Sequence, residues 1–402
     1  MKILHTADWH LGKKLDRFSR IDEQVDVLNE IVEIAESENV DLVLIAGDLF
    51  DTFHPPTEAV DLFYKTLKRL SLNGKRPVIA IAGNHDSPAM IDAPDPLARE
   101  CGIILIGQPK AIVTPLILDD FKISKTDQGF IELELNGYDY PVRILHTAFA
   151  NEVRLKEFFG ENKEDELNLS LRNSWKNIAD NYCDEKGVNL LMTHLYMNKR
   201  GTIPLDEPDG EKPIKIGNAD MIYSDAVPPQ IQYVALGHLH GHINIGTEHC
   251  PVIYSSSPVA YSFSETGQQK SVTIIEAFPN KKVSYRNIAL TKGKRLFRKI
   301  FTSIDEAETW LTANPETLVE VTIESDTYLK AEDNKRIFQA HNGIVYLIPK
   351  IKSNATRETS STKSIDVTAD IQELFFDYFK AKNAGQEPNE EIITLFDEIR
   401  KS

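Results

Sequence analysis

Several short segments of this sequence carry aspartate, asparagine and histidine, the residue types that bind divalent metal ions through oxygen and imidazole nitrogen. They read A-D-W-H, A-G-D-L-F-D, A-G-N-H-D-S, M-T-H and G-H-L-H, and each follows a short apolar run typical of a buried strand. The candidate metal ligands in these segments are Asp8, His10, Asp48, Asn84, His194, His238 and His240. Such a set could hold ions that activate water for hydrolysis.

Each segment taken alone has a simpler explanation. In V-A-L-G-H-L-H-G-H, histidines occupy every second position, so His238, His240 and His242 would point to the same side of a strand and could converge. They could equally be polar residues at the mouth of that strand. Aspartate or asparagine after a strand is commonly a turn residue, and a lone histidine such as His194 is commonly a hydrogen-bonded core residue. Only the whole set predicts a metal site.

The donor types and their order narrow the choice. Imidazoles, carboxylates and one amide oxygen, without a thiolate, favour Mn²⁺ or Mg²⁺ over a structural zinc site. In the order D-x-H, G-D, G-N-H-D, H and G-H-x-H, the segments resemble the signature of the calcineurin-like metallophosphoesterases over roughly residues 1–270. The resemblance implies an α/β fold, a metallophosphoesterase β-sandwich flanked by helices.

The same resemblance implies a role for each residue. Asp8, His10, Asp48 and His240 would hold one ion, and Asp48, Asn84, His194 and His238 the other, with Asp48 bridging them. A water between the ions would attack phosphorus in line. His85 would donate a proton to the leaving oxygen, and Asp86 would either orient His85 or form the turn. His242 falls outside the pattern.

Longer stretches select a branch of this superfamily. H-T-A-D-W-H-L-G-K-K-L-D-R-F-S-R, A-G-D-L-F-D-T-F-H-P-P-T-E-A and S-S-S-P-V-A-Y-S-F-S-E-T-G-Q-Q-K-S-V-T-I-I-E resemble the SbcD family, the nuclease subunits of bacterial SbcCD complexes. This implies a Mn²⁺-dependent DNA nuclease of end processing, repair, recombination and replication. It would be a 3′–5′ exonuclease on duplex ends and an endonuclease on single strands and hairpins. Archaeal relatives have a histidine where Asp51 stands, and neither Asp51 nor His54 receives a role.

Two other function classes remain open from the residues alone. A phosphatase or phosphodiesterase of small metabolites would use the same ligand set, but it leaves the C-terminal third unexplained. A scaffold with a decayed site would have lost at least one of Asp8, Asp48, Asn84 or His238, and all of them are present.

Apolar periodicity divides the chain into parts. Residues 1–277 alternate apolar strands with amphipathic helices such as 22–38 and 58–72, and form the predicted nuclease domain. Residues 278–352 read as a small α+β capping domain that faces DNA, with a capping-box spacing at Ser303 and Glu306. A polar linker at 353–366 precedes a helical segment at 367–402. The predicted strands of the first part are 2–8, 41–48, 77–84, 103–107, 130–135, 142–148, 189–194, 233–238, 252–257 and 271–278.

The net charge of the chain and its distribution along the sequence affect the prediction of DNA binding. The net charge of −16 disfavours phosphate binding by the chain as a whole. A basic stretch in the capping domain is nevertheless a candidate for sequence-independent DNA contacts, or else a solvated face. Its residues are Lys281, Lys282, Lys292, Lys294, Arg295, Arg298 and Lys299.

The C-terminal segment carries two apolar helical stripes. Resemblance implies that they bind an SbcC-type coiled-coil ATPase, although they could instead fold back onto the main body. The candidate partner-binding residues are Leu374, Phe375, Tyr378, Phe379, Leu395 and Phe396. The family also forms homodimers, here within a heterotetramer, through helices that correspond to 58–72 and 88–100. The apolar face of the first, with Val60, Phe63, Leu67 and Leu70, could equally be core.

Composition excludes some classes. No apolar run approaches the roughly 20 residues that span a bilayer, and the N-terminus enters a strand without a signal-like segment, so we expect a cytoplasmic protein that does not bind membranes. Cys101, Cys183 and Cys250 are widely spaced and are expected to be reduced thiols.

Overall fold

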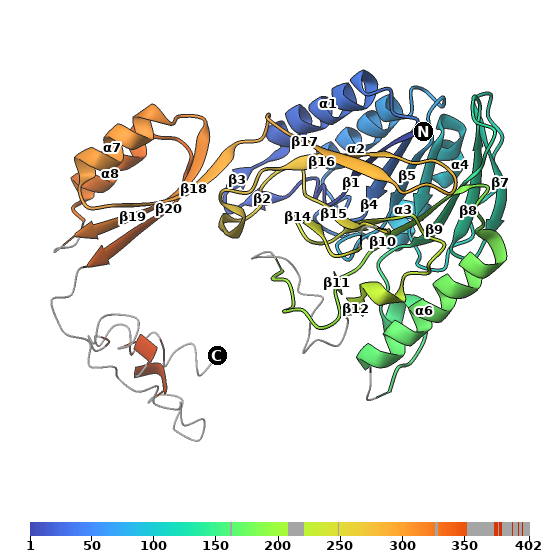
Figure 1. Ribbon diagram of the computed structural model, residues 1–402. Coiled ribbons are helices and arrows are strands. Elements are labelled where there is room, and N and C mark those ends of the chain that lie inside the picture. The colour runs from blue at the N-terminus through green and yellow to red at the C-terminus, as the bar shows by residue number, and fades with distance from the viewer. Residues whose placement is uncertain are drawn as a thin grey trace. The chain divides into compact units, whose positions relative to one another are not determined.

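Two β-sheets packed against each other form the larger part of the chain (Figure 1). The structure is a computed structural model, and it describes residues 1–160, 163–207, 221–247, 249–325 and 329–351, with 374–376, 378, 379, 388, 393 and 396 further on. A single cluster of buried apolar side chains from both sheets fills the space between them. This arrangement confirms the predicted metallophosphoesterase sandwich with flanking helices.

The first sheet has six strands in the order β17-β16-β1-β4-β5-β6. Strands β1, β4, β5 and β6 are parallel, and β16 and β17 add to it in the antiparallel sense. The parallel strands are almost wholly buried runs of valine, isoleucine, leucine and alanine, as expected for strands covered on both faces. The strand bounds are β1 Lys2–Thr6, β4 Leu42–Ala46, β5 Val78–Ile81, β6 Ile103–Ile106, β16 Ser271–Glu276 and β17 Ser284–Ala289.

The second sheet has seven strands in the order β14-β15-β13-β10-β9-β8-β7. Its centre, from β9 to β15, is parallel, and antiparallel strands lie at both edges. The strand bounds are β7 Phe121–Asp127, β8 Phe130–Leu135, β9 Val142–Thr147, β10 Val188–His194, β13 Tyr233–Gly237, β14 His242–Asn244 and β15 Val252–Ser255. Every strand predicted up to residue 278 is confirmed, whereas β7 and β14 were not predicted.

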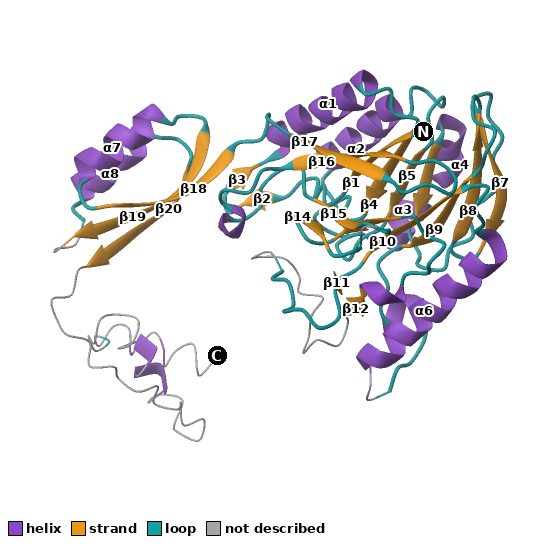
Figure 2. Cartoon of the chain, in the orientation of Figure 1, coloured by secondary structure: helices purple, strands orange, loops and turns teal. Residues whose placement is uncertain are grey.

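Helices cover the sandwich (Figure 2). The predicted helices 22–38 and 58–72 are confirmed as α1, Ile21–Ser37, and α2, Thr57–Leu70. Phe63, Leu67 and Leu70 of α2 are fully buried in the sandwich core, so the apolar face considered for dimerisation is core instead. An unpredicted helix, α6, Lys163–Tyr182, buries Leu171 and Trp175 against the second sheet. Short helices and minor strands complete this part: α3 Pro88–Asp92, α4 Asp95–Ala98, α5 Glu152–Leu155, β2 Lys14–Leu15, β3 Phe18–Ser19, β11 Met197–Asn198 and β12 Ile222–Tyr223.

A three-stranded parallel sheet follows in the order β18-β19-β20. Helices α7 and α8 cover one face of it, and Ser303 caps α7 by accepting the backbone N–H of Glu306, as predicted. The element bounds are β18 Arg295–Phe301, α7 Ile304–Ala313, β19 Thr317–Ser325, α8 Ala331–Ala340 and β20 Ile344–Ile351. Strand β17 pairs with β16 and therefore extends the first sheet. A small buried cluster that includes Leu15, Phe263 and Leu296 joins this sheet to the sandwich.

The C-terminal residues form a separate unit, Lys352–Ser402. The predicted linker, 353–366, and Leu395 lie outside the described residues. Within the unit, the Phe375 and Phe396 rings stack with centroids 4.1 Å apart, so the two predicted apolar stripes meet at this pair. No helix in the described part of the chain is long and apolar enough to cross a membrane.

Candidate metal centre

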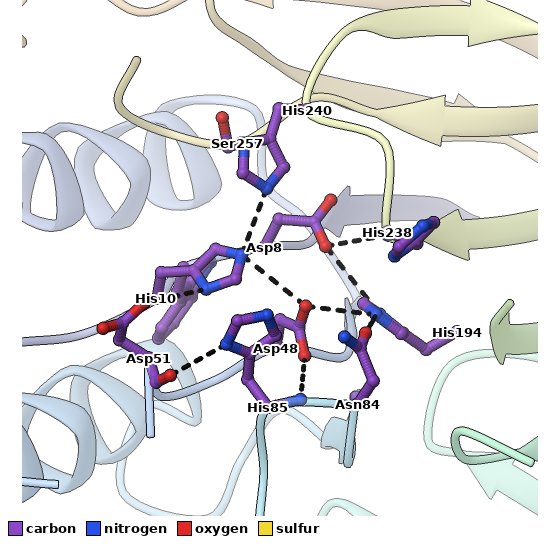
Figure 3. Close-up of polar contacts among 12 residues, drawn as sticks. Asp8, His10, Asp48, Asp51, Asn84, His85, His194, His238, His240 and Ser257 are labelled. Atoms are coloured by element: carbon purple, nitrogen blue, oxygen red, sulfur yellow. Dashed lines mark hydrogen bonds and ion pairs between the residues drawn. The ribbon is translucent and has the colours of Figure 1, made fainter. Parts of the chain in front are cut away.

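The candidate ligands converge from the ends of neighbouring strands (Figure 3). Asp8, Asp48 and Asn84 follow the adjacent parallel strands β1, β4 and β5, whereas His194 ends β10 and His238 follows its neighbour β13. Because parallel strands end at the same edge of a sheet, each sheet brings its ligands to one place. The two edges face each other, and the polar side chains of both sheets meet there.

The backbone at these positions is strained. Four candidate ligands adopt positive φ although none is a glycine: Asp8 at 55°, His10 at 42°, Asp48 at 48° and His238 at 111°. Such conformations cost roughly 1–3 kcal/mol each and persist where the surroundings enforce them. Backbone hydrogen bonds do so here, because Asp8 N–H donates to Gly47 O at 3.0 Å and His10 N–H donates to Asp48 O at 2.9 Å.

The glycines before the ligands are required by close approach. A β-carbon on Gly83 would lie 2.1 Å from Asp48 Oδ1, and one on Gly237 would lie 1.9 Å from the carbonyl oxygen of Ala46. No real side chain fits at such distances. The glycines of the G-N-H-D and G-H-x-H segments thus let one ligand loop rest directly against another.

The ring nitrogens and side-chain oxygens that face the centre of the site, here called the inner atoms, form two groups that share Asp48. His10 Nε2 lies 3.1 Å from His240 Nε2 and 3.6 Å from Asp48 Oδ2. His194 Nε2 lies 3.2 Å from Asp48 Oδ2 and 3.0 Å from Asn84 Oδ1. Ligand atoms of Asp8, His10 and Asp48 all lie within 4.8 Å of one another, and so do those of Asp48, His194 and His238.

Outer partners fix which ring nitrogen faces inward. His194 Nδ1 lies 2.8 Å from the carbonyl oxygen of Ala46, which can only accept, so Nδ1 carries the proton. His240 Nδ1 lies 3.2 Å from Glu265 Oε1. His238 uses the opposite atom, with Nε2 2.8 Å from Glu207 Oε1, so its Nδ1 remains for the inner side. Carboxylate or carbonyl partners on the second nitrogen are typical of metal-binding histidines.

The inner donors fit cations. Once the Nδ1 atoms of His194 and His240 donate outward, the inner nitrogens present lone pairs toward carboxylate and amide oxygens. Asp8 is fully buried, and its Oδ2 has no hydrogen-bond partner among the described residues. Burial raises the pKa of Asp8 to about 7. Burial opposes the charge on His194, but Asp48 and Asp8 outweigh it and raise the pKa of His194 to about 9. Without metal, protons on Asp8 and His194 therefore offset the repulsion among the acceptor atoms of the site. Divalent ions could bind the same atoms in place of those protons.

His85 and Asp86 have different partners. The His85 ring lies 4.8 Å from the His10 ring, and its Nδ1 is 2.8 Å from the carbonyl oxygen of Asp51. Asp86 accepts backbone N–H groups of Gly83, Leu49 and Phe50, at 2.8, 3.0 and 2.9 Å. Asp86 was expected either to orient His85 or to form the turn. These contacts correspond to the second role, because they join the turn at Gly83 to the loop at Leu49 and Phe50. Burial, followed by the charge of Asp48, raises the pKa of Asp86 to about 6.

Four residues around the site were not predicted from the sequence. Glu207 and Glu265 contact the outer nitrogens of His238 and His240, and Lys270 Nζ lies 2.5 Å from Glu265 Oε2. Burial raises the pKa of Glu265, but His240 and Lys270 outweigh it and hold that pKa well below its usual range. Arg154 donates to the carbonyl oxygens of Gly83 and Asp86, both at 2.8 Å, and so supports the His85 loop. These residues are recognised only by their contacts with other buried charged or polar groups. Such contacts leave no pattern in the linear sequence.

Other predicted site residues lie elsewhere. His242, on β14, is half-buried and faces Tyr285, with ring centroids 6.5 Å apart.

The basic residues do not form one patch. Lys281 and Lys282 precede β17, Lys292 and Lys294 follow it, and Arg295, Arg298 and Lys299 belong to β18. Arg298 pairs with Glu320 at 3.0 Å, whereas Lys299 lies over the Trp310 ring on the helix-covered face.

Comparison with known proteins agrees with this geometry. Residues 1–242 match the calcineurin-like phosphoesterase family. The chain is 34% identical over 408 residues to the SbcD component of the nuclease SbcCD of Bacillus subtilis, covering 99% of this chain and 97% of that protein. It is 30% identical over 300 residues to the SbcD component of the same nuclease of Staphylococcus saprophyticus, covering 74% and 70%.

A solved dimetal phosphatase from Danio rerio is 13% identical, covers 73% of this chain and 99% of its own, and has a TM-score of 0.42. That likeness is too low to carry weight beside the family match and the two relatives. The chain therefore belongs to the calcineurin-like phosphoesterase family and, within it, to the SbcD family of SbcCD nuclease components.

Proposed function

We propose that this chain is a two-metal DNA phosphodiesterase and the nuclease subunit of an SbcCD-type complex. The observation that carries the proposal is the pair of ligand groups that share Asp48 and bring imidazole nitrogens and carboxylate oxygens together. The two relatives, which are named as components of a nuclease, support DNA as the substrate.

The proposed ligands follow the two groups. Asp8, His10, Asp48 and His240 would hold one divalent ion, and Asp48, Asn84, His194 and His238 would hold the other, with Mn²⁺ preferred and Mg²⁺ as the alternative. Bound there, the ions would activate a water for attack on phosphorus and offset the charge on the phosphate oxygens. The protein would contribute the fixed orientation of the rings, through Ala46, Glu265, Glu207 and Asp51.

His85 is the proposed proton donor. The carbonyl oxygen of Asp51 can only accept, so the His85 Nδ1 atom carries a proton and Nε2 is the atom that exchanges one with the leaving oxygen. Asp86 would act through the backbone, by holding the loops that carry Asp48 and His85 in register.

The finer activities belong to the same proposal. We infer a 3′–5′ exonuclease on duplex ends and an endonuclease on single strands and hairpins, acting in DNA end processing, repair and recombination. The chain would work as a homodimer with an SbcC-type ATPase, bound through 367–402. Residues 278–352 would face DNA, and the candidates with exposed side chains are Lys281, Lys282, Lys292, Lys294, Arg295 and Arg298.

An assay on end-labelled linear duplex tests this function. With Mn²⁺ we expect shortening from 3′ ends, with a slower reaction in Mg²⁺, none in chelator, and more activity with the ATPase partner. Asp48→Asn is the negative control, because it should abolish the reaction while leaving the fold. Hydrolysis of small phosphate esters without cleavage of DNA would instead point to a metabolite phosphodiesterase.

A further inference from the structure

Lys13 is a nearly buried cation beside the proposed metal ligands. It lies three residues after His10, and its backbone N–H donates to the carbonyl oxygen of His10 at 3.0 Å. Only 11% of its side chain is exposed, and its Nζ lies 3.3 Å from Asp51 Oδ1. An ammonium group is strongly hydrated and is rarely placed in a protein interior without a purpose that offsets its desolvation.

Asp51 connects this ammonium to the site. The oxygen that faces Lys13, Oδ1, also lies 3.7 Å from His10 Nδ1, the ring atom opposite the inner Nε2. His10, Asp51 and Lys13 therefore form a row. His240, Glu265 and Lys270 form a second row of the same composition, with distances of 3.2 Å and 2.5 Å.

The two rows differ in the exposure of the carboxylate, whereas the lysine side chains are similarly buried, at 11% exposed for Lys13 and 9% for Lys270. Glu265 is 2% exposed in its side chain, and the Lys270 ammonium also donates to the carbonyl oxygen of His240 at 2.9 Å and to Gln268 Oε1 at 3.1 Å. The Lys270 ammonium therefore has three acceptors within the fold, from His240, Glu265 and Gln268. Asp51 is 26% exposed, so solvent reaches the row that ends in Lys13 at this carboxylate.

This position suits contact with an anion. The inner site is rich in carboxylates, from Asp8, Asp48 and Asp86, and an incoming phosphodiester adds negative charge. Arg154, a further cation close to these loops, donates to the backbone carbonyls of Gly83 and Asp86. We propose that Lys13 binds a non-bridging oxygen of the substrate phosphate, and that Asp51 is the positioning residue that holds its ammonium there. The inference rests on the proposed DNA phosphodiesterase function.

Three variants test it. Lys13→Met removes the charge at similar length, Lys13→Arg keeps the charge, and Lys14→Met removes the charge of the exposed neighbouring residue as a matched control. For each, we would measure Mn²⁺ affinity by titration calorimetry, kcat and KM on duplex DNA, and the dependence of kcat/KM on salt. DNA affinity would be measured by anisotropy in a His85→Ala background, which should cleave slowly.

Loss of one charged hydrogen bond should lower kcat/KM on DNA by about 10- to 100-fold in Lys13→Met. The slope of log kcat/KM against log salt should become shallower by about one, because one phosphate contact is lost. Mn²⁺ affinity should stay within about threefold, Lys13→Arg should regain most of the activity, and Lys14→Met should behave as the parent.

Two results would overturn the inference. One is a parental kcat/KM and salt slope in Lys13→Met; the other is a loss of Mn²⁺ affinity as large as the loss of kcat/KM, which would make Lys13 only a support for His10. Failure of the parent chain to cleave DNA at all would reject the proposed function itself, and the two failures are therefore distinguishable.

Discussion

The inner nitrogens of His10 and His240 face each other across 3.1 Å, although the residues are 230 positions apart in the sequence. Each ring has a carboxylate behind it, Asp51 for His10 and Glu265 for His240. Two imidazole lone pairs at this distance repel each other unless a proton or a cation lies between them. A bound ion would therefore remove this repulsion as well as a shared proton does.

Asp48→Asn should reduce metal binding at both ligand groups, because Asp48 is the residue that the groups share. We expect Mn²⁺ affinity to fall by well over the ~100-fold that loss of an outer partner costs. Titration calorimetry would measure affinity and stoichiometry, with circular dichroism as the control for folding. Retention of two Mn²⁺ ions at parental affinity would contradict the shared-ligand geometry.

His85→Ala should keep metal binding and lose turnover. The His85 ring contacts the carbonyl oxygen of Asp51 and lies outside the two groups that share Asp48; it belongs to a third group of possible ligands, with His10 and Asp51, that does not include Asp48. General-acid assistance contributes about 10²- to 10⁴-fold, so kcat on DNA should fall by that factor. Hydrolysis at the parental rate, with Mn²⁺ stoichiometry unchanged, would remove His85 from the proton-donor role.

Glu265→Gln should weaken metal binding without touching an inner atom. The carboxylate of Glu265 orients His240 through Nδ1, and loss of such a partner typically costs 10- to 100-fold in metal affinity. Glu276→Gln, at an exposed position on β16, is the matched control and should bind as the parent does. Equal affinities of the two variants would show that the orientation of His240 does not depend on Glu265.

Gly83→Ala should destabilise the fold, because the new β-carbon would meet Asp48 Oδ1 at 2.1 Å. Overpacking of this kind costs about 1–3 kcal/mol in unfolding free energy. Gly293→Ala is the control, since its nearest neighbour, Val27 Cγ2, would lie at an ordinary 3.7 Å and the change should stay within about 0.5 kcal/mol. Chemical denaturation would measure both, and similar values for the two would count against the tight loop contact.

Without metal, the contribution of His146 to the free energy of unfolding should fall as pH is lowered from about 6.5 toward 4, whereas the buried carboxyls of Asp8 and Asp86 contribute in the opposite sense. Burial lowers the pKa of His146 to about 4, and neither of its ring nitrogens has a hydrogen-bond partner among the described residues. Because His146 of the unfolded chain binds a proton in this range and His146 of the folded chain does not, its contribution to the free energy of unfolding rises with pH there. This contribution is fully present above about pH 6.5. His5, whose pKa burial lowers to about 3, adds to the same trend.

His146→Leu removes one of these protons. In chelator, the slope of unfolding free energy against pH between about 4 and 6.5 should decrease by up to about 1.4 kcal/mol per pH unit. Urea denaturation at a series of pH values would measure it. A slope unchanged by the substitution would mean that His146 is not kept neutral by the fold.

Much of the sandwich could be predicted because its strands are continuous apolar runs, and the ligand positions could be predicted because each follows such a run. The edge strand β7 is half-exposed and the short β14 is exposed or half-exposed throughout, so neither has that signature. Strand β17 pairs with β16 although most of its residues are exposed. From the sequence, these residues were predicted to belong to the capping domain, 278–352.

Contacts between distant residues escaped prediction. Glu207 reaches the site from a loop and Arg154 from the short helix α5, and only tertiary packing brings them to His238 and to the Gly83 loop. The basic stretch shows the opposite effect. Arg298 and Lys299 are neighbours in sequence, yet consecutive strand residues point to opposite faces of a sheet. Proximity in sequence was therefore a poor guide to a shared surface.

The division of ligands between the sheets has a mechanical consequence. His10 and Asp48 follow strands of the first sheet, while His194 ends a strand of the second sheet and His240 follows another, so ions bound between them would cross-link the two halves of the sandwich. Removal of the ions would release that cross-link and leave carboxylates and rings at the seam unsatisfied. The seam should then become the first part of the sandwich to exchange amide hydrogens with solvent, well before its outer strands separate.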